Sequence, residues 1–424
     1  MTGVQTCALP ICQGSGGHRV PVGDRGEHHE QPHRSQREEH HGRDILRNIS
    51  TSYHALYFFC LLISFWFVLV RWVALRSVEK KVIVYVIAIF FMPIVSVLPG
   101  AIAEKYDSLE DILVGILRVM FSLPIYLVIL ASPSDRKTIN ILLVAVALIT
   151  LIAALSVPYQ FLFGAISWFA MESERAGLDR FSSLFGSLTA LGGVVGCGLL
   201  AAVVSIRSAF WSAATVSGIV LGALLSLQKA AVANIVLCLL YLVLVKNFDA
   251  KRIYALAIYF LIVFGLVSAF FIGEISSFLK TVQIVSSSDF SGDFSFQESI
   301  WQRFLELPSV AVDFHGASSL LFGIGPVGGS GALGYPDVPM SHNGFVDLFL
   351  VGGIGFFLLF ICSLLFVFSK SRQDISEFEL SVVRFGTFCL FLLLLNMLFS
   401  GLTFFTPSGA MFFAVSIKCL LLKR

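Results

Sequence analysis

Residues 297–355 read QESIWQRFLELPSVAVDFHGASSLLFGIGPVGGSGALGYPDVPMSHNGFVDLFLVGGIG. This stretch ends the long polar loop of an otherwise apolar chain, and a new apolar run begins inside it. It contains Arg303, His315, His342 and a cluster of glycines. A chain that gathers such groups at the edge of an apolar run is expected to perform chemistry or recognition at a membrane surface.

The composition places the chain among membrane proteins. Hydrophobic residues make up 57% of its 424 residues and charged residues only 13%, and the mean hydropathy is +0.86. Soluble domains carry roughly twice that charged fraction. Apolar runs of about 17–25 residues recur, and because they are continuous rather than alternating they predict helices, not barrel strands. The net charge of +2 gives no reason to expect nucleic acid as a partner. We therefore predict an all-α polytopic membrane protein.

The first fifty residues differ from the rest. Residues 1–50 contain no apolar run long enough to span a membrane, and their opening, MTGVQTCALPIC, is similar to a translated sequencing adapter. We expect this segment to be a spurious or disordered head that is not part of the fold. Two other interpretations are metal binding by its His-rich tract and glycosylation at Asn48-Ile49-Ser50.

The remaining chain is predicted to form about eleven transmembrane helices. Residues 51–272 hold about eight of them, residues 273–341 form a large periplasmic loop, and residues 342–424 hold the last three. An apolar piece near 158–170 is too short and too interrupted to cross, so we expect it to lie along the interface or to re-enter. The predicted spans lie near residues 54–75, 81–99, 111–131, 138–157, 183–205, 208–226, 229–246, 253–272, 342–368, 382–400 and 403–421.

Basic residues in the short loops predict the orientation. Cytoplasmic loops carry an excess of Lys and Arg, so the richer set of loops is predicted to be cytoplasmic, and the loops near 100–110, 158–182 and 273–341 face outward. The first span then starts outside, beside the spurious head, and we expect a parent protein with twelve spans and both ends cytoplasmic. The richer set contains Arg76, Lys80, Lys81, Arg136, Lys137, Arg207, Lys246, Lys251, Arg252, Lys370, Arg372, Lys423 and Arg424.

Five basic residues are candidates for substrate binding on the outward side. Arg175, Arg180, Lys229 and Arg303 lie in outward loops, and Arg118 lies in the third span below the outer surface. A charge at a helix centre costs about 2.5–3.5 kcal/mol on insertion scales, so such residues usually face a cavity. The planar fork of arginine suits phosphate oxygens. These residues predict a cavity for an anionic lipid head such as a polyprenyl pyrophosphate; the alternative is interfacial anchoring, with Arg118 snorkelling outward.

The start of the ninth span carries the candidate acid–base groups. His342 begins it, Asn343 follows, and Asp347 lies one to two turns inside. A neutral imidazole can accept a proton from an acceptor hydroxyl near neutral pH; the alternative for His342 is a polar interfacial anchor. Asp347 is predicted to line the cavity or to orient polar neighbours, whereas His315 is predicted to be structural or solvated.

Several other motifs are excluded. Residues 323–328, Gly-Ile-Gly-Pro-Val-Gly, match G-x-G-x-x-G, but neither a buried strand nor a soluble βαβ unit surrounds them, as a dinucleotide site requires. We instead predict a tight turn that brings backbone close to the membrane surface or to a substrate. Because metal-binding motifs and a P-loop are both missing from the sequence, no metal and no cofactor are predicted.

Three segments together resemble the bacterial O-antigen polymerase and O-antigen ligase superfamily. The first, 180–186 running on to Gly192, is similar to the family's Arg-then-Phe-Gly segment, without its Asn-Pro-Asn. The second, 321–325 after Arg303, resembles its late Gly-x-Gly turn. The third, His342-Asn343 followed by the glycines at 352, 353 and 355, resembles the start of the span after the loop. Relatives often carry Ser-Arg where this chain has Gln228-Lys229, which keeps the charge but loses the fork.

The resemblance implies glycosyl transfer at the periplasmic face of the bacterial inner membrane. The donor would be a glycan on undecaprenyl pyrophosphate, and neither metal nor nucleotide sugar would be required. His342, Arg303 and Arg180 would be catalytic, with the arginines neutralising the leaving pyrophosphate. The substrate-binding residues would be Arg175, Lys229, Arg118, Asn343 and Asp347.

The acceptor separates two enzyme classes. A polymerase would extend another lipid-linked repeat unit, with a chain-length regulator as a further candidate partner, whereas a ligase would transfer the glycan to lipid A–core. We favour the polymerase because this superfamily pattern serves many surface polysaccharides. A lipid-linked oligosaccharide transporter or flippase is the alternative of another class. Transporters often show internal repeats and broken helices near the midplane, whereas the polar groups here gather on one face.

Overall fold

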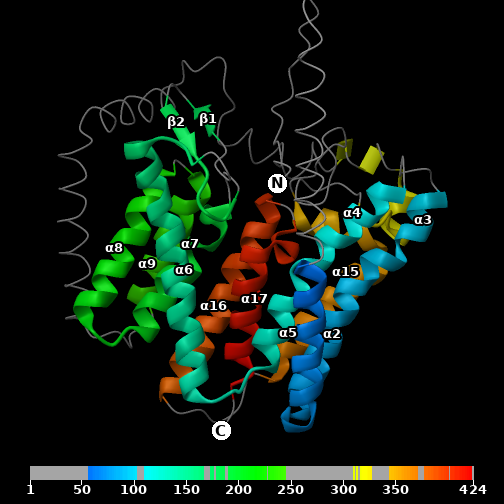
Figure 1. Ribbon diagram of the computed structural model, residues 1–424, viewed down its shortest axis with the longest axis horizontal. Coiled ribbons are helices and arrows are strands. Elements are labelled where there is room, and N and C mark those ends of the chain that lie inside the picture. Colours follow the sequence, from blue (N-terminus) through cyan, green and yellow to red (C-terminus); the bar gives the residue numbers. More distant parts are fainter. Residues whose placement is uncertain are drawn as a thin grey trace, which may run out of the picture.

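The computed structural model describes residues 56–102, 109–166, 172–175, 178–186, 190–226, 228–244, 309–310, 312–313, 316–326, 343–370, 377–400 and 402–422. These residues are mostly helical (Figure 1). Five helices are long and apolar enough to cross a membrane: Leu56–Ala74, Ser77–Ile102, Arg136–Phe163, Gly344–Ser369 and Leu380–Leu398. The predicted class, a helical membrane protein, is confirmed, while the head 1–50 and the predicted span 253–272 lie outside the described residues.

The first three predicted spans form five helical pieces. Helix Leu56–Ala74 ends in the 3-10 turn η1 (Trp72–Ala74), and α2 (Ser77–Val95) is followed by α3 (Val97–Ile102). The predicted span 111–131 is interrupted, because α4 (Leu109–Met120) and α5 (Leu123–Ala131) are separate helices. Pro124 lies in the first turn of α5, where its missing amide hydrogen costs no helical bond.

The helix α6 (Arg136–Phe163) is longer than predicted. Asp135 caps it by accepting a hydrogen bond from the Thr138 amide at 2.8 Å, which holds the pKa of that carboxyl below its ordinary value. The helix continues beyond the predicted end at residue 157, so the first half of the apolar piece 158–170 extends a span rather than lying apart. Pro158 lies inside α6, where neighbouring helices pack closely enough to support it. Helix α8 is so close that a Cβ at Gly222 would overlap the Ala154 backbone of α6.

A short antiparallel hairpin follows α6. It consists of β1 (Glu172–Arg175) and β2 (Leu178–Phe181) and departs from the all-α prediction. In the predicted span 183–205, residues 182–186 form a turn, and the described helix is α7 (Ala190–Ser205). The next two helices, α8 (Ala209–Leu225) and α9 (Lys229–Leu244), agree with the predicted spans 208–226 and 229–246.

Among the described residues after 316 are the short α14 (Ser318–Phe322) and three longer helices. These are α15 (Gly344–Lys370), α16 (Glu377–Ser400) and α17 (Pro407–Leu420). The last predicted span, 403–421, begins with the 3-10 turn η3 (Thr403–Phe405) rather than with α-helix. Thr406 then starts α17 by accepting a hydrogen bond from the Gly409 amide at 3.1 Å.

Helices α16 and α17 lie between two groups of helices (Figure 1). On one side are α6 to α9, where α7 contacts α16; on the other are α2, α5 and α15, where α5 contacts α17. The η3 turn packs into the second group, with Phe405 against Phe90 at 5.0 Å and Phe404 against Tyr126 at 4.8 Å between ring centroids. Ser122, at the break between α4 and α5, donates a hydrogen bond to the Phe405 carbonyl. The break between α4 and α5 and the η3 turn before α17 therefore pack against each other.

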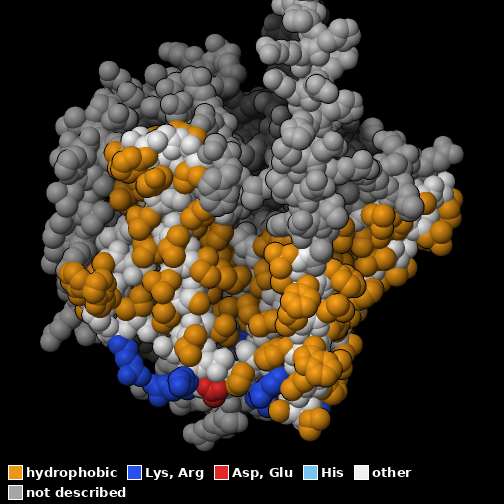
Figure 2. Space-filling view, viewed as in Figure 1, with side chains coloured by type: hydrophobic (Ala, Val, Ile, Leu, Met, Phe, Trp, Pro, Cys, Tyr) orange, Lys and Arg blue, Asp and Glu red, His pale blue; other side chains and the backbone are white. Residues whose placement is uncertain are grey.

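The surface separates apolar from charged side chains (Figure 2). Hydrophobic side chains cover the helical walls, and several are widely exposed, such as Trp66 at 69% and Val73 at 91%. Described Lys and Arg side chains gather at the end where α2 and α6 begin, which we call the basic end. An apolar belt of this kind suits contact with lipid.

Candidate functional site

The predicted site residues differ in how far the structure places them. Arg303, His315 and His342 lie outside the described residues. Arg118 lies in α4, Arg175 ends β1, Arg180 lies in β2 and Lys229 begins α9; for these four, only the backbone position is described. Asn343 and Asp347 are described with their side chains.

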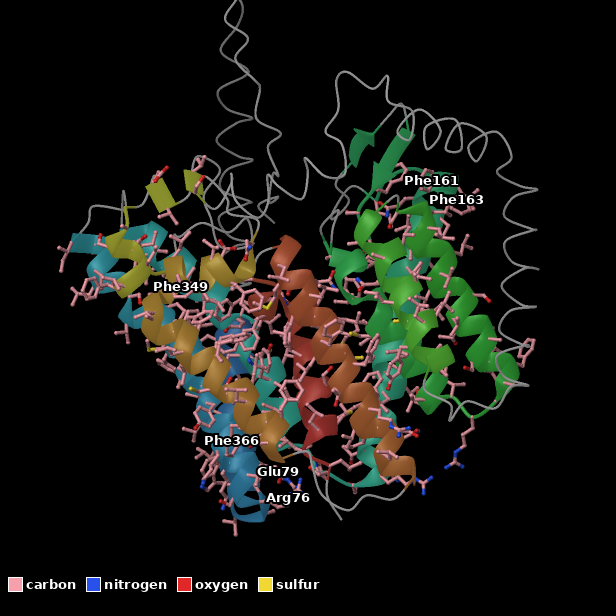
Figure 3. All side chains as sticks on the ribbon, turned by 180° about the vertical axis from the view of Figure 1, so that it is seen from behind. Arg76, Glu79, Phe161, Phe163, Phe349 and Phe366 are labelled. Carbon is pink, nitrogen blue, oxygen red and sulfur yellow. The ribbon has the colours of Figure 1, made fainter. Side chains whose placement is uncertain are left out.

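The placed positions fall into two groups at one end of the bundle. Helix α4 and the start of α15 lie on one side of α16 and α17, and the hairpin lies on the other side, above α6 and α7 (Figure 1). Phe161 of α6 lies at the end opposite the basic end, where Arg76 and Glu79 lie, and Phe349 of α15 lies between the two, in the half away from Arg76 (Figure 3). The structure therefore places these candidate positions away from the basic end, but in two separate groups.

Asn343 forms the start of α15. Its side-chain oxygen accepts hydrogen bonds from the amides of Phe345 at 3.1 Å and Val346 at 3.4 Å, and its carbonyl accepts from the Asp347 amide at 3.0 Å. This is an N-cap, which satisfies amides that would otherwise lack partners. Asp347 is fully buried in the first turn, where the positive end of the helix dipole favours a carboxylate. Asn343 thus has a structural task at the position next to His342.

The late loop returns onto α15 through the Gly-x-Gly turn. The amide of Ile324 donates to the Leu350 carbonyl at 2.8 Å, and the amide of Gly325 donates to the Val351 carbonyl at 3.0 Å. Both carbonyls lie just before Gly353, where a φ of +69° and ψ of −174° interrupt the helix. The loop amides therefore satisfy carbonyls at an interruption in α15. The backbone of the turn therefore contacts the backbone of α15, and the sequence did not predict this contact.

Two glycines make this contact possible. A Cβ at Gly323 would lie 2.7 Å from the Gly352 carbonyl carbon and the Gly353 nitrogen, and a Cβ at Gly353 would lie 2.7 Å from the Phe322 carbonyl carbon. On the other side of the turn, a Cβ at Gly115 of α4 would meet Pro326 at 3.0 Å. Two of the three segments that carry the family resemblance are therefore in direct contact, next to the helix that contains Arg118.

Replacing Gly353 by Ala is expected to detach the turn. Its backbone conformation is close to one that only glycine adopts readily, at about 1–3 kcal/mol for other residues, and the new methyl group would also overlap the turn. Hydrogen exchange of the Ile324 and Gly325 amides measures the release. Gly355→Ala is the matched control, because a Cβ there would meet only the end of Met92 at 3.4 Å. Unchanged exchange in Gly353→Ala would contradict the docking.

The second group is built on the end of α6. Gln160 is fully buried, and its amide nitrogen donates to the carbonyls of Ser156 at 2.9 Å and Ser182 at 2.8 Å. The Ser156 hydroxyl accepts a hydrogen bond from the Leu184 amide at 3.0 Å. These bonds attach the turn after β2 to α6. In the hairpin itself, Ser173 pairs with Arg180 and Arg175 with Leu178, so positions 175 and 180 share one face.

A buried polar network lies beside this turn. Gln228 accepts a hydrogen bond from the Gly192 amide at 2.6 Å, and Asn234 donates to the Gly192 carbonyl. Asn234 also donates to the side-chain oxygen of Asn396 at 3.3 Å, and Asn396 donates to the Gly193 carbonyl at 2.9 Å. The network joins α7, α9 and α16, and sequence analysis missed both asparagines. The available signal was a lone Asn inside an apolar span, which usually faces the bundle interior.

A second missed cluster lies at the basic end. The Lys418 ammonium is fully buried and donates to Glu79 Oε1 at 3.2 Å, to the Leu130 carbonyl at 2.9 Å and to the Ser132 carbonyl at 2.6 Å. Arg76 donates to the same Glu79 oxygen at 3.0 Å. The cluster joins α2, α5 and α17. It lies away from the predicted catalytic end, and its partners give it a role in holding the helices together.

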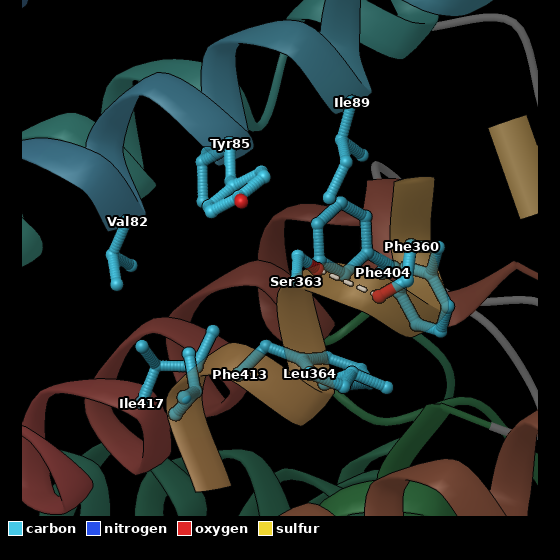
Figure 4. Close-up of a pocket in the computed structure, with 11 residues that line it drawn as sticks. Val82, Tyr85, Ile89, Phe360, Ser363, Leu364, Phe404, Phe413 and Ile417 are labelled. Atoms are coloured by element: carbon cyan, nitrogen blue, oxygen red, sulfur yellow. Dashed lines mark hydrogen bonds between the residues drawn. The ribbon is translucent and has the colours of Figure 1, made fainter. Parts of the chain in front are cut away.

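A small apolar cavity lies between α2, α15 and α17 (Figure 4). It has a volume of about 20 Å³, and its polar atoms include the Ser363 hydroxyl, which already donates to the Phe360 carbonyl at 2.7 Å. No charged residue and no predicted site residue lines it, so it does not suit a pyrophosphate. The lining consists of Val82, Tyr85, Val86, Ile89, Phe360, Ser363, Leu364, Val367, Phe404, Phe413 and Ile417.

The described part of the chain offers no metal centre: no group of three or more His, Cys, Asp or Glu side chains within it is arranged to hold an ion. His315 and His342 lie outside that part.

Comparisons with protein-family models, with curated proteins and with solved structures gave no match. The family resemblance therefore stays a prediction from the three sequence segments.

Proposed function

We propose that this protein is a membrane-embedded glycosyltransferase that polymerises glycan repeat units carried on undecaprenyl pyrophosphate. The observation that supports this most is the docking of the Gly323–Gly325 turn onto the interrupted start of α15. Two segments of the family pattern, distant in sequence, form one unit in the helix that follows His342 in the sequence. A transferase needs its loop and its acid–base helix in a fixed relation, since misplacement by about 1 Å can cost 10²-fold in rate.

The proposed topology has about eleven spans in this chain. The five long helices and four shorter apolar ones, Ala190–Ser205, Ala209–Leu225, Ala230–Leu242 and Pro407–Leu420, are consistent with a polytopic protein. The positive-inside rule supports a cytoplasmic basic end. The start of α15 and the hairpin would then lie at the periplasmic face of the bacterial inner membrane, where lipid-linked glycans are joined.

In the proposed reaction, an acceptor hydroxyl attacks the anomeric carbon of the donor sugar. The bond from that carbon to the phosphate oxygen breaks, and the lipid pyrophosphate leaves with the bonding electrons. His342 takes the hydroxyl proton, and Arg180 and Arg303 neutralise the charge on the leaving group. The proposal assigns pyrophosphate binding to Arg118 of one group and to Arg175 and Lys229 of the other, which requires the pyrophosphate to lie between the two groups (Figure 1). The Asn343 cap sets the direction of the first turn of α15, which carries Asp347.

The reaction is tested with purified protein in lipid vesicles and a lipid-linked repeat unit as the only sugar substrate. Formation of longer lipid-linked glycans supports the polymerase. Transfer only after lipid A–core is added identifies the ligase. Movement of a labelled donor across the vesicle membrane without bond formation identifies the transporter. We expect polymer to form in the presence of a metal chelator, because the proposed site uses arginines in place of a cation.

Arg303→Ala is expected to lower the polymerisation rate by about 10²–10³-fold, as the loss of one transition-state charge partner does. The rate of polymer formation in the same vesicles measures this. Arg207→Ala serves as the matched control, since Arg207 lies just before the N-cap of α8 and is not among the predicted site residues. Equal rates for the two variants would remove Arg303 from the mechanism.

A further inference from the structure

The basic end carries more positive charge than its described carboxylates, Glu79 and the α6 cap Asp135, neutralise. Arg76 and Lys418 both donate to Glu79 Oε1, as does the Ser134 hydroxyl, and the Arg76 amide donates to Glu79 Oε2 at 3.0 Å. Both oxygens of Glu79 are therefore in use. Within 4.0 Å of Arg71 and Lys80, which lie nearby, no described residue presents a carboxylate oxygen.

Arg71 has an unused donor. Its Nε is buried, and none of the residues that the structure describes accepts a hydrogen bond from it. Arg71 lies five residues before Arg76, which belongs to the buried cluster, and the Arg71 carbonyl accepts a hydrogen bond from the Leu75 amide at 3.1 Å. The Nε itself is out of reach of an external group, but Arg71 as a whole is partly exposed and no other atom of its guanidinium is both buried and unpartnered, so the outer part of the guanidinium can meet an external acceptor.

Trp72 places the positive charges of Arg71 and Lys80 at the level of a membrane interface. Lys80 Nζ lies 5.7 Å from the centroid of the Trp72 ring, which is partly exposed at the end of helix Leu56–Ala74. The next residue, Val73, is 91% exposed. Tryptophan favours the headgroup level of a bilayer, where its ring is half apolar and half wet. The cations beside Trp72 thus lie next to an apolar outer surface and at the depth of lipid phosphates.

We propose that Arg71, Trp72 and Lys80 form a binding site for the headgroup of an anionic phospholipid in the leaflet at the basic end. A phosphate diester offers oxygens that accept from a guanidinium in a forked geometry and attract the ammonium of Lys80. Its acyl chains would lie along the apolar wall formed by helix Leu56–Ala74, whose exposed residues include Leu69 and Val70. This site is independent of the proposed transferase reaction.

The test compares the full chain in vesicles of phosphatidylcholine alone and in vesicles that also contain phosphatidylglycerol. The melting temperature of the wild type is expected to rise with phosphatidylglycerol, because a ligand that binds only the folded state stabilises it. Arg71→Gln and Lys80→Gln are each expected to remove most of that rise and to weaken phosphatidylglycerol binding about five-fold or more. Melting in phosphatidylcholine alone shows that each variant is folded.

Lys137→Gln is the matched control. It removes the same charge from an exposed lysine in the first turn of α6, also at the basic end. The control is expected to keep the full rise. An equal loss in all three variants would show diffuse attraction of the whole basic end and would overturn the site. A rise produced by inorganic phosphate in phosphatidylcholine vesicles would assign the site to a free anion and would also overturn the proposal.

Discussion

Glu79→Gln is expected to destabilise the folded protein by about 3–5 kcal/mol, the cost of leaving one member of a buried ion pair without its partner. Glu79 is 4% exposed and the Lys418 ammonium is fully buried. The substitution preserves size and one acceptor oxygen but removes the charge. Lys418 would then have only neutral acceptors, the carbonyls of Leu130 and Ser132 and the oxygen of the new amide, and none of them neutralises an ammonium in the apolar interior. Reversible unfolding in mixed micelles measures the loss.

A double-mutant cycle separates the pair from its surroundings. Lys418→Met removes the cation and leaves Glu79 with Arg76 and Ser134. The double variant Glu79→Gln with Lys418→Met leaves no buried ammonium, and it is expected to be more stable than Glu79→Gln alone. Strict additivity of the two single effects would show that the two side chains are not coupled, contrary to the 3.2 Å distance between Lys418 Nζ and Glu79 Oε1.

His342→Ala is expected to lower the rate of glycan polymerisation by about 10²–10⁴-fold, the usual contribution of a general base. The physical reason is that the acceptor hydroxyl would lose the group that takes its proton during attack. Glycan ladders on the surface of a complemented strain and the purified assay both report the loss. Protein abundance in the membrane must stay equal, because a change in folding would also remove the ladders.

His315→Ala provides the control for that experiment. His315 lies in the same late loop region and is predicted to be structural or solvated, so its loss is expected to leave the ladders unchanged. A normal ladder in His342→Ala would exclude His342 as the base. A loss of ladders in both variants, at equal abundance, would point to a general role of the loop rather than to one imidazole.

The positions of the helices followed from hydrophobicity alone, but their interruptions did not. Helices α8, α9 and α16 lie where uninterrupted apolar runs predicted them. The break between α4 and α5 and the 3-10 turn at Thr403–Phe405 were missed, although a proline follows each, Pro124 and Pro407. A proline alone does not place a break, because Pro93 and Pro158 lie inside helices. The two interruptions are joined by a contact between distant segments, Ser122 with the Phe405 carbonyl, which no local pattern contains.

The candidate site, too, was predicted only in part from the sequence. The polar character of the chain around His342 and the glycines of the late turn were visible in the sequence. That the turn would meet α15 at Gly353 was not, because glycine spacing shows where backbone can approach but not which backbone it approaches. Asn234 and Asn396 were overlooked because each is a single polar residue in an apolar run, and only their meeting on Gly192 and Gly193 gives them a shared role.

The amino-acid sequence by itself determined that this chain is a helical membrane protein, where most of its helices lie, and which loops carry charge. These properties depend on the transfer of local segments from water to lipid, a free energy that each segment contributes independently. Only the tertiary structure decided where helices break, which carbonyls the late turn satisfies and how Lys418 is neutralised. Those outcomes depend on pairing polar groups inside an apolar interior, and the partners come from segments far apart along the chain.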